Sequence, residues 1–346
     1  MQKILMFLGL TLLLMLGNSN QVIFAQRGGR AQEVIEVRVG SPLPQNSPWG
    51  RSLDRVAAEW NRITNGQVRL NIRHGGIEGS ETRMQMSLAS NTIQAAVFTS
   101  IGLNEYNPSI LTLSAPFLIR TYDELNAVMN EVQGDLEAGI NSGDYFIISW
   151  SRAGFVNVFS RDPVFTPDDL RRQRIASNPE TEDMNTAFKT MGFQVVDSDF
   201  VDIGQRLATG QIQAIYNNPA AVAAFQLNTY LRNMLSINLA PVIGGIVINQ
   251  VTWRRIGALD PTYQQSLIRV TRQLTEELDR SMQRTVNDAI NAMARGGLVV
   301  NRPNQSQEQL WYNEIERTTP ALLGSIYDRA LYQRINNILT RFRSSR

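Results

Sequence analysis

Residues 33–50 of the chain read EVIEVRVGSPLPQNSPWG: an alternating run, a proline-rich loop and the start of a helix. Apolar and polar side chains alternate through the first eight of these residues, which predicts a half-buried β-strand. Ser47 can then cap a helix that has Pro48 at its first position. Apolar residues at helical spacing extend this helix to about Thr64. The stretch therefore predicts a strand followed directly by an amphipathic helix.

The same order repeats immediately downstream. A second alternating run occupies residues 67–73, a helix capped by Ser80 follows, and residues 94–99 form a third strand pattern. Strand, helix, strand, helix, strand in this order predicts a parallel α/β sheet. Further strands are predicted at residues 145–150, 156–160, 173–176, 194–196, 214–216 and 242–249. Further helices are predicted to begin at Thr166 and to cover residues 183–191 and 202–209.

The longest predicted helix begins at Asp260-Pro261 and meets no breaker until Gly296-Gly297. At 1.5 Å per residue it is about 50 Å long, whereas a small domain is only about 30 Å across. We therefore expect this helix to brace two domains. A last amphipathic segment, Pro320 to Arg343, is predicted to be one helix that packs on the surface.

The N-terminus has the layout of a secretory signal peptide. Lys3 supplies a positive charge, residues 4–16 are uncharged and almost wholly apolar, and Ala25 follows a polar break. This apolar run is shorter than the ~20 residues that a membrane span needs. We expect residues 1–25 to be removed by cleavage near Ala25, residues 26–33 to be a flexible N-terminus, and the protein to be exported. The pattern leaves open a retained N-terminal anchor.

The composition allows a packed core and disfavours a nucleic-acid partner. Apolar residues make up 43% of the chain, and the formal net charge is only +2. All basic residues except Lys3 and Lys189 are arginines, and these are scattered among acids instead of forming one basic face. The chain has no cysteine, so disulfides and a cysteine-linked lipid anchor are excluded.

The side chains of metal sites and nucleophilic catalysis are nearly absent. His74 is the only histidine, and no cysteine can supply a ligand or a nucleophile. Asp197, Asp199 and Asp202 lack the full ligand spacing of a calcium loop. Residues 75–80, GGIEGS, lack the lysine of a P-loop and predict a tight strand-to-helix turn. We expect no metal, no cofactor and no enzyme activity.

Several short motifs occur together in a fixed order. These are Ser41-Pro-Leu-Pro with Ser47-Pro-Trp-Gly50, Leu113-Ser-Ala-Pro-Phe-Leu118, Thr166-Pro-Asp-Asp-Leu170, and Leu207-x-x-Gly210 with Asn217-Asn-Pro219. With Trp253 before the long helix, this set resembles the extracytoplasmic solute receptors of TRAP transporters, the DctP-like family. The resemblance extends from about Val34 to Phe342.

The resemblance implies an α/β, two-domain fold of the periplasmic binding protein type (class II, TRAP type) with a long domain-bracing helix. The expected N-terminal lobe comprises residues 34–153 plus 242–281, and the C-terminal lobe comprises residues 154–241 plus 282–310. Residues 311–346 are expected to pack across the lobes. A small-molecule ligand would bind in the cleft between the lobes, and the periplasmic receptor would deliver it to a membrane permease.

Two departures from the family pattern concern ligand chemistry. Ala176 and Val156 occupy positions where typical members place arginines that bind a substrate carboxylate. Because a buried carboxylate without such partners is costly, we expect an apolar or amphipathic ligand. This loss resembles a branch of the family whose receptors work with a periplasmic tetratricopeptide-repeat protein. Arg152 or Arg174 remains open as a substitute clamp.

The ligand-binding candidates combine aromatic, small and polar residues on the predicted cleft. They are Leu43, Phe98, Thr99, Trp150, Val156, Ala176, Phe200, Tyr216, Asn217 and Asn218; either asparagine can be the polar anchor. Three alternatives remain open: a carboxylate receptor, an exported enzyme, and a scaffold that binds only a protein partner.

Overall fold

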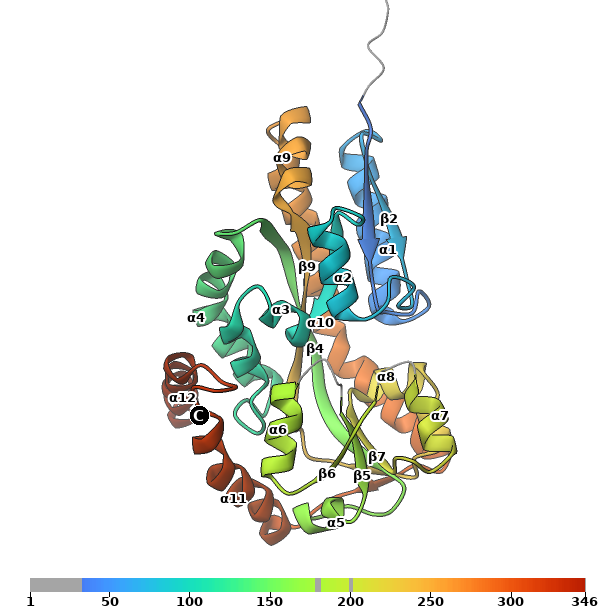
Figure 1. Cartoon of the computed structure of the whole chain (residues 1–346), viewed down its shortest axis with the longest axis vertical. Coiled ribbons are helices and arrows are strands. Elements are labelled where there is room, and N and C mark those ends of the chain that lie inside the picture. The colour runs from blue at the N-terminus through green and yellow to red at the C-terminus, as the bar shows by residue number, and fades with distance from the viewer. Residues whose placement is uncertain (1–32, 178–181, 199–201, 346) are drawn as a thin grey trace, which may run out of the picture. The chain divides into compact units, whose positions relative to one another are not determined.

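The first three strands form the parallel arrangement that the sequence predicts (Figure 1). They are β1 (Ile35–Gly40), β2 (Val68–Arg73) and β3 (Ala95–Thr99), joined by α1 (Pro48–Ile63) and α2 (Glu81–Ala89). The predicted caps are confirmed, since Ser47 accepts a hydrogen bond from the Gly50 N–H and Ser80 accepts one from the Arg83 N–H. The computed structural model describes residues 33–177, 182–198 and 202–345, so the predicted signal peptide, Asp199 and Phe200 lie outside the described residues.

Two long strands complete the centre of the sheet. β9 (Ala240–Asn249) is antiparallel both to β3 and to β4 (Tyr145–Ser160), which makes the sheet mixed. The prediction of two separate strands in 145–160 was wrong. Gly154 has a φ of +97° and lies where the β4–β9 register shifts between Arg152 and Phe155, so the chain bulges there without ending the strand.

β4 joins two halves of the sheet. We call β1, β2, β3 and β9, with Tyr145–Arg152 of β4, the N-terminal half-sheet; its last strand is the edge strand β2. The C-terminal half-sheet continues from Asn157–Ser160 of β4, directly or through neighbouring strands, into strands from the second half of the chain. These are β5 (Arg174–Ser177), β6 (Gln194–Asp197), β7 (Ala214–Asn217), β8 (Asn233–Leu235) and β10 (Val299–Asn301).

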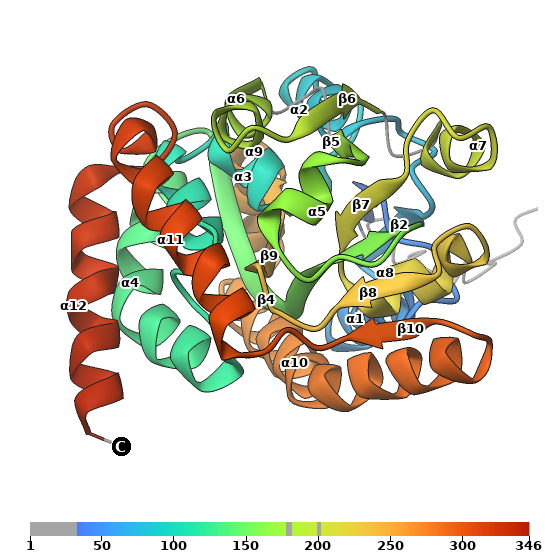
Figure 2. The same ribbon diagram turned by 90° about the horizontal axis from the view of Figure 1, so that it is seen from below.

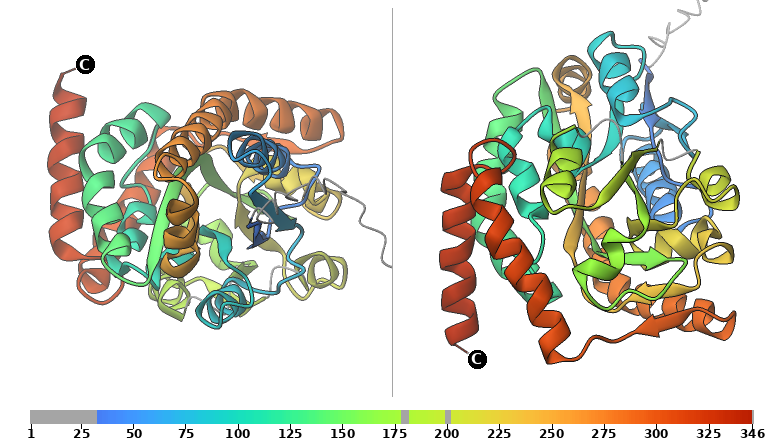
Figure 3. Two further views of the ribbon diagram at one scale, coloured as in Figure 1. Left: turned by 90° about the horizontal axis from the view of Figure 1, so that it is seen from above. Right: turned by 60° about the horizontal axis from the view of Figure 1, so that its bottom comes forward.

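Helices cover both faces of the N-terminal half-sheet, as Figure 2 and Figure 3 show from below and above. On one face α1, α9 (Gln250–Leu259) and the 33-residue α10 (Tyr263–Arg295) bury a hydrophobic cluster around Trp60 and Trp253. The other face buries Phe98 and Ile147 in the largest cluster. That face is covered by α2, α3 (Ser100–Asn104), the 3-10 helix Pro108–Ser114 and α4 (Tyr122–Asn141).

The largest hydrophobic cluster extends from the N-terminal into the C-terminal half-sheet, where it includes Phe188 and Trp311. A third cluster, around Phe159 and Ile215, lies on the opposite face of the C-terminal half-sheet. The short elements around these two clusters are α5 (Pro167–Arg171), α6 (Glu182–Thr190), α7 (Ile203–Ala208), α8 (Pro219–Ala224) and the 3-10 helix Leu227–Thr229.

The C-terminal segment corrects a second prediction. Residues 320–343 are not one helix, because α11 (Gln305–Leu322) includes Pro320 and ends before Gly324, which has a φ of +89°. A new helix, α12 (Arg329–Ser344), then lies alongside α4 (Figure 2). Three arginines of α12 pair with acids of α4: Arg334 with Asp135, Arg341 with Glu131, and Arg343 with Glu124.

Candidate functional site

β4 passes from one half-sheet to the other at Gly154, where the neighbouring side chains leave little room. A Cβ atom placed on Gly154 would lie 2.8 Å from the Tyr122 hydroxyl and 3.0 Å from the Asn218 side-chain nitrogen. It would also lie 3.6 Å from Cγ of Met282. The first turn of α4, the start of α8 and the middle of α10 therefore converge on one glycine.

Asn218 fastens one side of this passage. Its Nδ2 donates to the carbonyl oxygens of Ala153 at 2.7 Å and Phe155 at 3.2 Å, and its Oδ1 caps α8 by accepting the Ala220 N–H at 2.8 Å. The side chain is buried, and both of its amide hydrogens are used on the protein backbone. Of the two asparagines proposed as a polar anchor, Asn218 thus holds the β4 bulge, while the neighbouring Asn217 is half-buried at the end of β7.

Asp279 of α10 fastens the other side. One carboxylate oxygen, Oδ1, accepts hydrogen bonds from the Ser151 hydroxyl and the Arg152 N–H, both at 2.9 Å. Burial raises the pKa of Asp279 to about 6, although both hydrogen bonds and the Arg152 charge act in the opposite direction. A carboxyl group with a raised pKa therefore contacts the strand two and three residues before Gly154.

Both arginines considered as substitute clamps donate to protein groups. The Arg152 guanidinium reaches Asn126 at 2.9 Å and Gln133 at 3.4 Å, both on α4. The Arg174 guanidinium donates to the carbonyl oxygens of Gly210 and Gln211, each at 2.6 Å, and is exposed. Arg152 is therefore the one placed beside the β4 bulge.

The apolar candidates divide between the two faces of the C-terminal half-sheet. Val156 and Tyr216 are half-buried on the face of the largest cluster, where the Tyr216 ring lies 4.9 Å from that of Phe188. Ala176 is 4% exposed and belongs to the cluster on the opposite face. Because successive side chains of a strand alternate between faces, these three do not converge on one point.

Two further candidates lie in the core of the N-terminal part. Phe98 is 1% exposed and its ring lies 5.6 Å from that of Tyr106. Trp150 is 6% exposed, and its indole N–H donates to Glu137 at 3.1 Å. Both side chains serve packing in this structure, and a role in ligand contact stays a prediction for them.

Leu43 and Thr99 lie where two parallel strands, β1 and β3, reach their carboxyl ends, the edge at which α/β proteins commonly bind ligands. Leu43 is half-buried, and its carbonyl oxygen accepts the Gly75 N–H at 2.9 Å. Thr99 caps α3 by accepting the Ile101 N–H. The last candidate, Phe200, lies outside the described residues.

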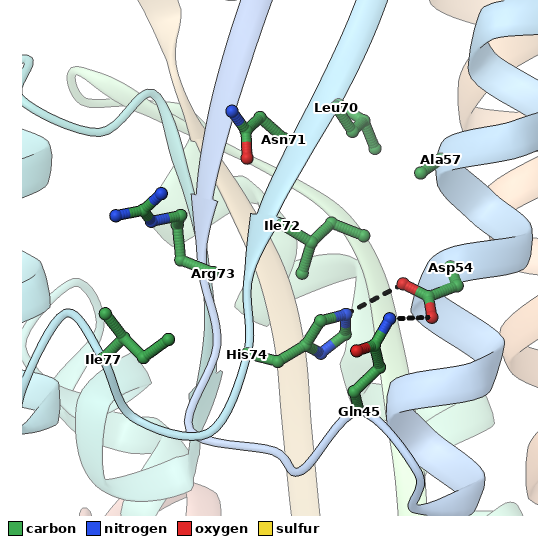
Figure 4. Close-up of a pocket in the computed structure, with 9 residues that line it drawn as sticks. All are labelled: Gln45, Asp54, Ala57, Leu70, Asn71, Ile72, Arg73, His74 and Ile77. Atoms are coloured by element: carbon green, nitrogen blue, oxygen red, sulfur yellow. Dashed lines mark hydrogen bonds and ion pairs between the residues drawn. The ribbon is translucent and has the colours of Figure 1, made fainter.

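A separate pocket of about 390 Å³ opens between α1 and the edge strand β2 (Figure 4). Figure 4 shows His74 and Gln45 turned toward Asp54, with Nε2 of His74 2.8 Å and Nε2 of Gln45 3.1 Å from its carboxylate. The sequence patterns do not predict this pocket, since no local pattern pairs residues 54 and 74. The pocket is lined by Gln45, Asp54, Ala57, Leu70, Asn71, Ile72, Arg73, His74 and Ile77.

Two features are absent from residues 33–177, 182–198 and 202–345. Within these ranges no three histidine, cysteine, aspartate or glutamate side chains are grouped closely enough to hold a metal ion. In the same part of the chain no helix combines the length and the apolar character required to span a membrane.

Two solved structures with the same fold are TRAP periplasmic solute-binding proteins. A TRAP periplasmic solute-binding protein from Ralstonia eutropha, with bound (S)-2-acetolactate, has a TM-score of 0.81 at 17% identity and covers 88% of this chain and 99% of its own. One from Sulfitobacter sp. NAS-14.1, with bound β-D-galacturonate, has a TM-score of 0.79 at 15% identity with the same coverage. This likeness shows the two-domain α/β fold.

The match to a curated sequence relative covers a smaller part of the chain. A solute-binding protein of Chromohalobacter salexigens is 25% identical over 179 residues, and the chain spans about half of its length, 52%. A family model described as bacterial extracellular solute-binding protein, family 7 (DctP), matches residues 39–322. Since this match includes most of the chain, from Val39 to Leu322, the protein belongs to the DctP family of bacterial extracellular solute-binding proteins.

Proposed function

We propose that this protein is the periplasmic solute receptor of a TRAP-type transporter. The single observation that carries the proposal is the family match over residues 39–322. The receptor binds a small ligand between an N-terminal lobe, residues 34–153 plus 242–281, and a C-terminal lobe, residues 154–241 plus 282–310. It then delivers the ligand to a membrane permease. Export by a cleaved signal peptide, and binding without catalysis, are parts of the same proposal.

The preferred ligand is apolar or amphipathic. Val156 and Ala176 stand where the family resemblance places carboxylate-binding arginines. The guanidinium groups of Arg152 and Arg174 already donate to the protein. A ligand carboxylate without a cationic partner would lose several kcal/mol on burial.

A carboxylate receptor is the second candidate. Two structures with the same fold hold carboxylates, acetolactate and galacturonate. On this chain Arg152 is the arginine beside the β4 bulge, and it would have to exchange Asn126 and Gln133 for the ligand. Such an exchange would replace two neutral acceptors by the ligand carboxylate and pair the two charges, so its cost is modest compared with burying a bare carboxylate.

Two measurements separate the candidates. Native mass spectrometry of the purified full-length protein should reveal an apolar or amphipathic molecule that co-purifies. Thermal unfolding with alkyl amphiphiles, dicarboxylates and hexuronates should show stabilisation by the first group, about 2.7 kcal/mol at 100 times the Kd. A response to acids that is lost in Arg152→Gln would replace the apolar proposal by the carboxylate one. No response to any ligand in either measurement would argue against a receptor.

The missing arginines also support a protein partner. They resemble the family branch that works with a periplasmic tetratricopeptide-repeat protein, and we include such a partner beside the permease. Cross-linking in cells, followed by identification of the linked proteins, should recover a tetratricopeptide-repeat protein and permease subunits. Recovery of permease subunits alone would remove the repeat protein from the proposal.

A further inference from the structure

We propose that Asp279 is a positioning residue that sets how β4 passes Gly154, and that uptake of one proton by its carboxyl group tightens this passage. The effect on the strand can be measured without any ligand. Its consequence for ligand affinity rests on the proposed receptor function.

The geometry gives Asp279 direct control of the strand. Its Oδ1 accepts two hydrogen bonds from consecutive residues of β4, from the Ser151 hydroxyl and from the Arg152 backbone, each at 2.9 Å. The backbone contact fixes the peptide group two residues before Gly154. A movement of α10 at this level therefore moves the strand with it.

The strand departs from regular pairing at this point and is held on both sides. Gly154 has a φ of +97°, and the β4–β9 register shifts between Arg152 and Phe155. Asn218 of α8 holds the far side through the carbonyl oxygens of Ala153 and Phe155. The glycine thus lies between two anchors on different helices, as expected of a hinge.

Few other charges act on Asp279. On β4 the nearest is Arg152, and on α10 itself it is Glu276, which opposes the negative charge. On α1, Arg55 pairs with Glu277 at 2.9 Å. Residues 219–224, which form α8, contain only proline, alanine and valine, and Tyr122 of α4 approaches Gly154 with a hydroxyl group. The protonation state of Asp279 is therefore governed mainly by its own burial.

The direction of the effect follows from that burial. The pKa of Asp279 is raised to about 6 in the structure, where its carboxyl group contacts β4. The carboxyl group therefore binds a proton more tightly in this contact than in a conformation that exposes it to water. By linkage, protonation favours the observed arrangement. Loss of the proton above pH 6 leaves a partly buried charge, which is relieved when the contact opens.

Amide hydrogen exchange of the ligand-free protein tests this. After correction for the intrinsic rate, the Arg152 amide of the wild type should exchange about tenfold faster at pH 7.5 than at pH 5. Asp279→Asn keeps an oxygen acceptor without the charge, so its Arg152 amide should stay protected at both pH values. Asp288→Asn, at an exposed position nine residues further along the same helix, should behave like the wild type. Equal exchange of wild type and Asp279→Asn at pH 7.5 would overturn the proposal.

One further variant and one binding measurement complete the test. Ser151→Ala removes one hydrogen bond but leaves the carboxyl group, so its pH dependence should persist; loss of that dependence would contradict a role for Asp279. For any ligand found by the screen above, the Kd of the wild type should change between pH 5 and 7.5, and that of Asp279→Asn should not. Failure to find a ligand would count against the receptor function, whereas a pH-independent Arg152 amide would count against the hinge.

Discussion

The indole N–H of Trp60 on α1 donates a hydrogen bond to the hydroxyl of Thr271 on α10 over 2.8 Å, across 211 residues of sequence. Both side chains are fully buried, at 1% and 0% exposure. The Trp60 ring also lies 6.2 Å from that of Trp253 on α9. This hydrogen bond thus joins the long helix α10 directly to α1, the helix that follows the first strand.

Removing that acceptor should destabilise the fold. Thr271→Val keeps the shape of the side chain but leaves the Trp60 N–H buried without a partner, which costs about 1–3 kcal/mol. Chemical denaturation at neutral pH measures the change in the free energy of unfolding. Thr285→Val is the matched control, because the hydroxyl of Thr285 on the same helix makes a solvent-exposed hydrogen bond to the Ser281 carbonyl oxygen. A similar loss in both variants would mean that the indole contact is not the cause.

Alanine substitutions at two glycines should act in opposite directions. At Gly154 the positive φ and the 2.8 Å approach of the Tyr122 hydroxyl leave no room for a Cβ, so Gly154→Ala should lose about 1–3 kcal/mol. Gly134 is exposed within α4 and has open space around its Cβ position, so Gly134→Ala should gain about 0.5–1 kcal/mol. Thermal and urea unfolding of the two variants give the signs directly; stabilisation by Gly154→Ala would refute a constrained bulge.

Restoring an arginine at position 176 should not restore a carboxylate site. Ala176 is 4% exposed among the hydrophobic side chains of the third cluster, and a buried unpaired charge costs about 3–5 kcal/mol. Ala176→Arg should therefore unfold at much lower urea concentration than the wild type. Ala224→Arg introduces the same side chain at the exposed end of α8 and should change stability by less than about 0.5 kcal/mol. A stable Ala176→Arg would show instead that this position opens into the ligand cleft.

The docking of α12 on α4 should depend on pH through Glu124. Burial alone would raise the pKa of Glu124, but hydrogen bonds from the Arg343 guanidinium and the Arg120 N–H outweigh it and hold the pKa below its ordinary value of 4.5. A lowered pKa contributes stability above about pH 4.5, and that stability is lost as the pH falls through the folded-state value.

The variant Glu124→Gln checks this sign. It should lose about 1–3 kcal/mol relative to the wild type at pH 7, and the difference should shrink below pH 4.5. Glu131→Gln removes an exposed partner of Arg341 on the same helix and should cost less than about 1 kcal/mol at either pH. A wild-type advantage that persists unchanged at pH 3 would contradict the assignment.

Local signals predicted the elements well where a side chain caps its own backbone. Ser47, Ser80 and Thr166 all cap the helices that the sequence assigns to them. Gly154 shows the limit of such reasoning, because a glycine with positive φ suits both a turn that ends a strand and a bulge within one. Only the pairing of β4 with β9, about ninety residues later, distinguishes the two.

Predicting the candidate site requires knowledge of long-range contacts that sequence spacing does not encode. Alternation assigns Ala176 and Ser177 to opposite faces of β5, but which face packs on which helix follows from strands and helices distant in sequence. The motif leaves either Asn217 or Asn218 as the polar anchor, and only the folded structure shows that the Asn218 amide donates to the carbonyl oxygens of Ala153 and Phe155. Asp279 gave no signal, since an acid within a long helix looks like any solvated residue.

The position of β9 between β3 and β4 has a consequence for biogenesis. Strand β3 ends at Thr99, yet its antiparallel neighbour begins only at Ala240, so a nascent chain shorter than about 250 residues has no partner for that edge. Non-local pairing of this kind slows folding and delays it until most of the polypeptide has emerged. Truncated chains that stop before Ala240 should thus stay protease-sensitive. Resistance of the whole molecule to proteases should appear only after β9 has been synthesised and has paired with β3 and β4.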